Sequence, residues 1–106
     1  MKAVVAGPER GLADALAAEG VDVTRVEEGY VTRERLLDAG IEDAALYVLT
    51  DVSEATSIPI ALDDNPSLRV VVFAPETMPE FVRGQVDLAM DPAVMPVESV
   101  AEELAE

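Results

Sequence analysis

The first 27 residues constrain the fold of this chain more than any other stretch, because they have the pattern of a βαβ unit. Residues 3–6 are an apolar run without alternation, which is typical of a strand covered on both faces of a parallel sheet. Residues 12–17 carry an apolar stripe at helical spacing, Gly20 ends the expected helix, and residues 21–26 form a second strand. This unit predicts an α/β protein with a parallel sheet.

The rest of the chain repeats the alternation of strands and helices. Apolar runs predict strands at residues 46–50, 68–73 and 86–90, the last of them at a sheet edge. Helices are expected to start after Thr32, after residues 51–53, at residues 77–79 and at Val97, and Pro59 should kink the third helix or lie in its early turn. At 106 residues, the chain has the length of one domain, spanning residues 1–106.

The charge of the chain excludes several partners. The sequence has 22 acidic and 7 basic residues, a net charge of −15, and Lys2 is its only lysine. Such a surface repels nucleic acids and anionic membranes, and no apolar run approaches the roughly 18 residues of a membrane span, so we expect neither nucleic-acid binding nor membrane insertion. This acidic composition is typical of salt-adapted haloarchaeal proteins. We therefore expect a cytoplasmic protein that requires molar salt, in which the Debye length falls to about 3 Å.

Candidate binding residues gather where the first and third expected strands end. Gly7 and Gly11 flank the turn after the first strand, and Arg10 within this turn could supply positive charge to a phosphate. Thr50 and Asp51 follow the third strand, beside the switch point at which α/β proteins bind ligands. A plainer interpretation is also open: the glycines serve a tight turn, Arg10 is solvated, and Asp51 caps a helix.

Glu27 is the candidate residue for selecting a cofactor. It lies twenty residues after Gly7, at the end of the second strand, where a carboxylate can accept a ribose hydroxyl. Such a residue favours NAD(H) or an adenine nucleotide over NADP(H), because a 2′-phosphate would repel it. Acidic residues are so abundant in this sequence that coincidence explains its position equally well.

Residues 32–51 read TRERLLDAGIEDAALYVLTD. This segment resembles one in the TrkA-N (RCK) nucleotide-binding domains of potassium-uptake regulators, which runs from a helix, through AGIEDAD, to a strand ending in LTD. Residues 65–72 resemble that family's NP…RV strand, and residues 86–92 resemble its GADVVISP strand. The resemblance implies a Rossmann-like domain that senses a nucleotide.

The chain departs from the TrkA-N pattern in ways that bear on its fold. Its phosphate loop is shorter than Gly-x-Gly-x-x-Gly, Pro8 in this loop lacks an N–H, and Tyr30 replaces an aspartate of the family. Between the positions that correspond to residues 27 and 29, the family has a helix and a strand that this chain lacks. Their deletion leaves a three-layer αβα fold with a five-stranded parallel sheet in the order 2-1-3-4-5, a truncated Rossmann or flavodoxin-like arrangement.

Catalytic classes are poorly supported. The sequence has no histidine or cysteine, no Gly-x-Ser-x-Gly elbow and no Walker loop. A phosphoreceiver with Asp51 as acceptor would share the strand order, but residues 7–8 are Gly-Pro where a receiver has an acidic pair, and residues 91–92 are Asp-Pro where a receiver has Lys-Pro.

Two functional hypotheses remain open. In the first, the domain senses NAD(H) or an adenine nucleotide and passes its occupancy to a regulatory partner protein. In the second, it is a degenerate relative that binds no cofactor and serves as an interaction unit or a homodimer.

Overall fold

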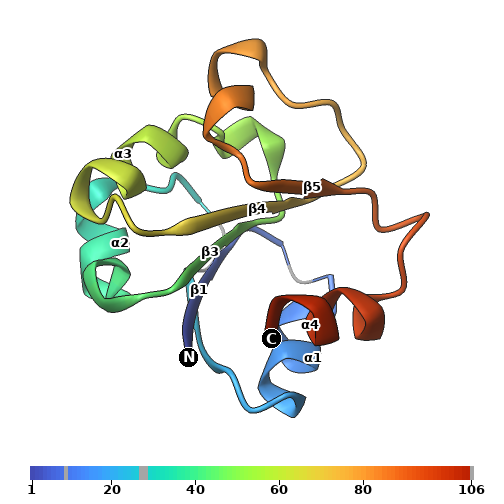
Figure 1. The fold of residues 1–106 in the computed structure, drawn as a ribbon. Helices are drawn as coiled ribbons and strands as arrows, with labels where there is room; N and C mark the ends of the chain where they lie inside the picture. Colours follow the sequence, from blue (N-terminus) through green and yellow to red (C-terminus); the bar gives the residue numbers. More distant parts are fainter. Residues whose placement is uncertain (9, 27–28, 106) are drawn as a thin grey trace.

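The computed structural model describes residues 1–8, 10–26 and 29–105, and it has one five-stranded sheet between two layers of helices (Figure 1). All neighbouring strands are parallel, and their order is β2-β1-β3-β4-β5. The predicted flavodoxin-like α/β class is therefore confirmed. The strands are β1 (Lys2–Ala6), β2 (Asp22–Val26), β3 (Leu46–Leu49), β4 (Arg69–Phe73) and β5 (Leu88–Met90).

Helices cover both faces of the sheet. Helices α1 and α4 pack against each other on one face, whereas α2, α3 and the 3-10 segment η3 lie on the other (Figure 1). None of the helices in the described ranges is both long and apolar enough to cross a membrane. The helical elements are α1 (Leu12–Ala18), α2 (Arg33–Asp38), η1 (Ile41–Asp43), η2 (Val52–Glu54), α3 (Ser57–Asp64), η3 (Glu80–Gln85) and α4 (Val97–Ala105).

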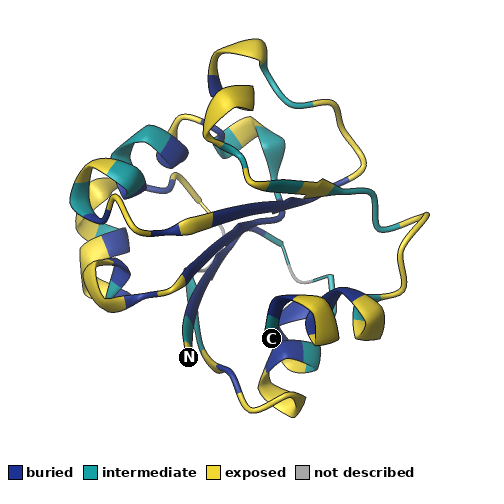
Figure 2. Cartoon of the chain, viewed as in Figure 1, coloured by how far each residue is buried: buried dark blue, intermediate teal, exposed yellow. Residues whose placement is uncertain are grey.

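The three inner strands are buried on both faces, which explains why their sequences are apolar without alternation (Figure 2). In β1, Val4 and Ala6 belong to the core under α2 and α3, whereas Ala3 and Val5 belong to the core under α1 and α4. The two edge strands are more exposed: β5 is only partly buried, and β2 is buried fully only at Val26.

Local sequence signals account for some of the helix boundaries. Thr32 caps α2 as predicted, because its side chain accepts a hydrogen bond from the Arg35 N–H at 3.2 Å. Pro59 lies in the first turn of α3, where its missing N–H costs nothing. The expected helix at residues 77–84 is instead the 3-10 segment η3, in which Val82 is buried and Phe81 is 62% exposed.

Two hydrogen bonds connect η2, α3 and β3. The Ser57 hydroxyl donates to the Glu54 carbonyl at 2.7 Å, so the Tyr47 hydroxyl, 2.7 Å from Ser57 Oγ, is the donor in that second hydrogen bond. Burial raises the pKa of Tyr47 far above its ordinary value. The phenol is therefore neutral and available as a donor across the physiological range.

Candidate functional site

The loops after β1 and β3 meet at the carboxyl end of the sheet, where the sequence predicted a ligand. Gly7 follows β1 with a φ of +113°, and an added Cβ there would clash with Thr50 Oγ1 and lie 3.1 Å from the Asp51 backbone nitrogen. Only glycine fits this position, because both its backbone conformation and the space around it exclude a side chain. The glycine thus serves the close approach of two loops of the chain itself.

Thr50 joins these two loops. It is 1% exposed, its N–H donates to the Ala6 carbonyl at 2.9 Å, and its hydroxyl lies 2.8 Å from the Pro8 carbonyl and 3.2 Å from that of Ala6. Its carbonyl accepts a hydrogen bond from Arg10 Nε at 3.0 Å. The Arg25 guanidinium reaches the same loop and donates to the Gly7 carbonyl at 2.8 Å. Both arginines therefore hold the backbone of these loops.

Asp51 also has a structural task in this cluster. Its Oδ1 accepts hydrogen bonds from the Ser53 N–H at 2.9 Å and from the Ser53 hydroxyl at 2.6 Å, which caps η2. Glu54 Oε1 accepts the Val31 N–H at 2.7 Å. A cavity of about 250 Å³ remains beside these carboxylates, with Gly7, Pro8, Gly29, Asp51 and Glu54 among its lining residues. This volume is below the range of about 300–1,000 Å³ typical of small-molecule sites.

The structure brings most of the predicted site residues together. Gly7, Arg10, Thr50 and Asp51 form what we call the loop cluster, and its contacts are the hydrogen bonds given above. Gly11 faces elsewhere, since an added Cβ would lie 3.6 Å from Val97 at the start of α4. Glu27, the predicted ribose ligand, lies outside the described residues. In the described ranges, no three acidic side chains are grouped so that they could hold a metal ion.

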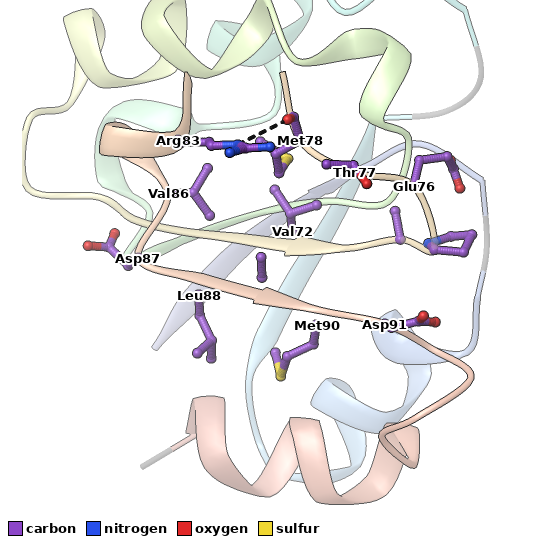
Figure 3. A pocket seen from close by; sticks show the side chains of 13 residues that line it. Val72, Glu76, Thr77, Met78, Arg83, Val86, Asp87, Leu88, Met90 and Asp91 are labelled. Atoms are coloured by element: carbon purple, nitrogen blue, oxygen red, sulfur yellow. Dashed lines mark hydrogen bonds between the residues drawn. The ribbon is translucent and has the colours of Figure 1, made fainter. Parts of the chain in front are cut away.

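Sequence analysis missed a second region, at the exposed edge of β5, where a hollow lies on each face of the strand. One hollow, of about 410 Å³, lies between β4, β5 and the segment leading into η3, and its walls include Val72, Met78 and Val86 (Figure 3). The other, of about 510 Å³, lies between β5 and α4, and its walls include Leu88, Met90 and Met95. We call this strand with its two hollows the β5 edge.

A signal for this region was present in the sequence. Three of the four methionines fall between residues 78 and 95, around the weakest of the predicted strands. Methionine is flexible and polarisable, and it is common on surfaces that adapt to different partners. Placing these side chains around one strand, however, required the three-dimensional fold.

By its sequence, the chain belongs to DUF7126, a family of unknown function, whose pattern matches residues 3–104. No curated protein is significantly similar in sequence. Membership in DUF7126 corrects the resemblance to TrkA-N domains, which was wrong. The shared segments run through α2, η1 and β3, into β4 and through β5, so they follow the alternation of helices and strands in this fold and did not identify the family.

Solved structures with the same fold come from regulatory and pilus-assembly proteins. An orphan response regulator of H. pylori superposes with a TM-score of 0.74 at 12% identity, covering 98% of this chain and 92% of that one. A protein of Burkholderia pseudomallei named as pilus assembly-related has a TM-score of 0.68 at 16% identity, with 99% and 89% coverage. A protein of Burkholderia thailandensis named for pilus assembly gives 0.67 at 16% identity, with 99% and 98% coverage. At these identities, the likeness establishes the shared fold.

Proposed function

We propose that this chain is a non-catalytic regulatory module that acts by binding a protein partner and does not sense a nucleotide. The observation that carries the proposal is the internal use of polar groups in the loop cluster. The Thr50 hydroxyl, the Thr50 carbonyl and the Gly7 carbonyl all have hydrogen-bond partners within the chain. Arg10 and Arg25 each donate from a guanidinium nitrogen to a backbone carbonyl, so a pyrophosphate entering this crevice would compete with these carbonyls for both side chains.

The chemistry of the other groups supports a non-catalytic role. The sequence lacks histidine and cysteine, which removes the commonest general base and the thiolate nucleophile. Asp51 lies just after β3, yet its Oδ1 accepts two hydrogen bonds from Ser53, and residues 7–8 supply no acidic pair beside it for Mg²⁺. The likeness to an orphan response regulator supports regulation through this fold, and we propose that it operates without phosphorylation of Asp51.

Amide NMR shifts in molar KCl test this proposal. NAD⁺, NADH, NADPH, ADP and AMP are each titrated to millimolar concentration into the labelled chain. We expect no saturable shifts at Gly7 or Thr50. Saturable shifts clustered there would overturn the proposal and restore nucleotide sensing.

Two matched variants identify the site if shifts do appear. Glu27→Ala should then weaken binding, because it removes the predicted ribose ligand. Glu103→Ala removes the same charge from the exposed face of α4 and should leave nucleotide binding unchanged.

A further inference from the structure

We infer that the β5 edge is the docking site for an extended segment of a partner protein that carries apolar side chains on both faces of its strand and lysine or arginine at its flanks. The inference rests on the proposed function and names the chemistry of the partner. An edge strand presents backbone N–H and C=O groups that an added strand can pair with. Among the described strands, β5 pairs only with β4, through Val71, Val72 and Phe73.

The side chains around β5 suit strand addition, because successive residues of an added strand point to opposite faces of the sheet. Leu88 and Met90 project toward α4, away from Val72 and Val86, so apolar side chains lie on both faces of the sheet at this edge (Figure 3). Ala89, between them, is exposed and small, and it leaves the edge unobstructed. Alternate side chains of a partner strand would enter the two hollows.

The negative charge around the β5 edge favours apolar partner segments that have basic flanks. Of the residues that the structure describes, five carboxylates and two guanidinium groups line the two hollows: Glu76, Asp87, Asp91, Glu102 and Glu103 against Arg69 and Arg83. A partner with basic residues on either side of its apolar stretch would complement this surface and be steered toward it. An acidic partner would be repelled.

The same charges disfavour a second copy of this chain at the edge. Each copy carries a net charge of −15, and two β5 edges brought together would place their carboxylates face to face. A short strand flanked by acidic residues is a common protection against edge-to-edge association. The opposite edge of the sheet differs, since Arg25 and Arg35 line the hollow beside β2. Head-to-tail association through β5 and β2 is therefore the self-association that the experiment must detect.

A peptide panel tests the inference on the full chain. The probes are about ten residues long, with a central stretch of alternating valine and leucine flanked by lysine pairs, and matched peptides carry glutamate pairs or a threonine-substituted centre. Amide NMR titrations are run at about 0.15 M and 1 M KCl, where the Debye length is about 8 Å and 3 Å. We expect saturable shifts at Leu88, Ala89 and Met90 with the lysine-flanked probe, and weaker binding at the higher salt concentration.

Charge-reversal variants separate the edge from the rest of the surface. Glu102→Lys/Glu103→Lys should weaken binding of the lysine-flanked probe by about five- to tenfold. The matched control, Glu42→Lys/Asp43→Lys, changes two adjacent exposed acids that line neither hollow, and it should bind as the wild type does.

Several results would overturn the inference: no shifts with any probe at millimolar concentration, equal binding of the glutamate-flanked peptide, or shifts confined to β2. The occupant would be a second copy if the molecular mass in light scattering rises with protein concentration and the amide shifts at both sheet edges change with it. Any of these outcomes, without nucleotide-induced shifts at Gly7 and Thr50, would leave the proposed function standing. Nucleotide-induced shifts there would overturn the proposed function itself.

Discussion

The loop cluster and the β5 edge are both candidate sites, and they differ in how their surface groups are used. In the loop cluster, arginine, threonine and aspartate side chains point at backbone groups of the same two loops, and the cavity that remains is small. At the β5 edge, apolar side chains line two larger hollows, and the strand lacks a neighbour on its outer side among the described residues. By its position in the fold, the loop cluster is the expected binding site. By its open apolar surface and its strand edge, the β5 edge is the better candidate.

This difference concerns a position at which α/β proteins typically bind ligands and at which the polar groups of this chain bond to one another. The carboxyl ends of parallel strands form a crevice in every doubly wound sheet, but a ligand binds there only if donors and acceptors remain available to it. Here Gly7 and Thr50 approach so closely that the two loops satisfy each other. These polar interactions stabilise the domain, and the proposed function assigns the recognition of other molecules to another surface.

The largest expected effect tests the contrast between the centre of the sheet and its edge. Val4→Asp should abolish folding, at a cost of about 4 kcal/mol or more, because Val4 is 0% exposed and a carboxylate there would be buried without a partner. Ala89→Asp introduces the same group at the exposed β5 edge and should cost about 1 kcal/mol or less. Urea unfolding followed by circular dichroism measures both. A cooperatively folded Val4→Asp variant would contradict the central placement of β1.

The next effect tests the close contact inside the loop cluster. Gly7→Ala should destabilise the chain by about 2–4 kcal/mol, because it forces a positive φ on alanine and places Cβ against Thr50. Gly84→Ala, in η3 beside the β5 edge, adds a Cβ that meets no other part of the described chain within 4 Å, and it should cost about 1 kcal/mol or less. Equal unfolding midpoints for the two variants would show that the loops do not pack as described.

A smaller effect isolates the hydrogen bonds of Thr50. Thr50→Val keeps the side-chain shape but removes the donor to the Pro8 and Ala6 carbonyls, at a cost of about 1–2 kcal/mol. Thr50→Ser keeps the hydroxyl and should be the milder change. Thr77→Val, at an exposed position of the β5 edge, should be close to neutral in the same urea titration. If Thr50→Ser proves as costly as Thr50→Val, the hydroxyl is not the stabilising group.

Much of the fold was predictable from the sequence, because it depends on local patterns. The apolar runs and the glycine that ends the first helix indicated parallel strands with helical crossovers, and the strand order is as predicted. The last strand was predicted too long: Asp87 Oδ2 accepts the Val70 N–H at 2.8 Å, so a side chain replaces part of the strand ladder and β5 starts at Leu88.

The candidate site was harder to predict. Gly7, Arg10, Thr50 and Asp51 lie near one another, whereas Gly11 faces α4 and Glu27 lies outside the described residues. The hydrogen bonds of the cluster depend on the pairing of β1 with β3, which brings Thr50 to Pro8 across 42 positions of sequence. The β5 edge was missed for a related reason: an apolar residue in a weak strand has the same sequence signal whether it is covered or exposed. Only the placement of η3 and α4 leaves the two hollows open.

The smallest expected effect concerns charge, and it distinguishes the influence of the net charge on stability from the influence of the β5-edge carboxylates on peptide binding. The wild-type melting temperature should rise by about 5 °C between about 0.1 M and 1 M KCl, because salt screens the repulsion of a chain with a net charge of −15. Glu102→Lys/Glu103→Lys and Glu42→Lys/Asp43→Lys remove the same amount of negative charge. Both should therefore reduce this rise by similar amounts, since long-range repulsion depends on total charge. Peptide binding should distinguish them, because only the first pair lines a hollow beside β5. A melting temperature indifferent to salt would contradict the salt requirement, and equal peptide binding by the two variants would remove the electrostatic role of the edge.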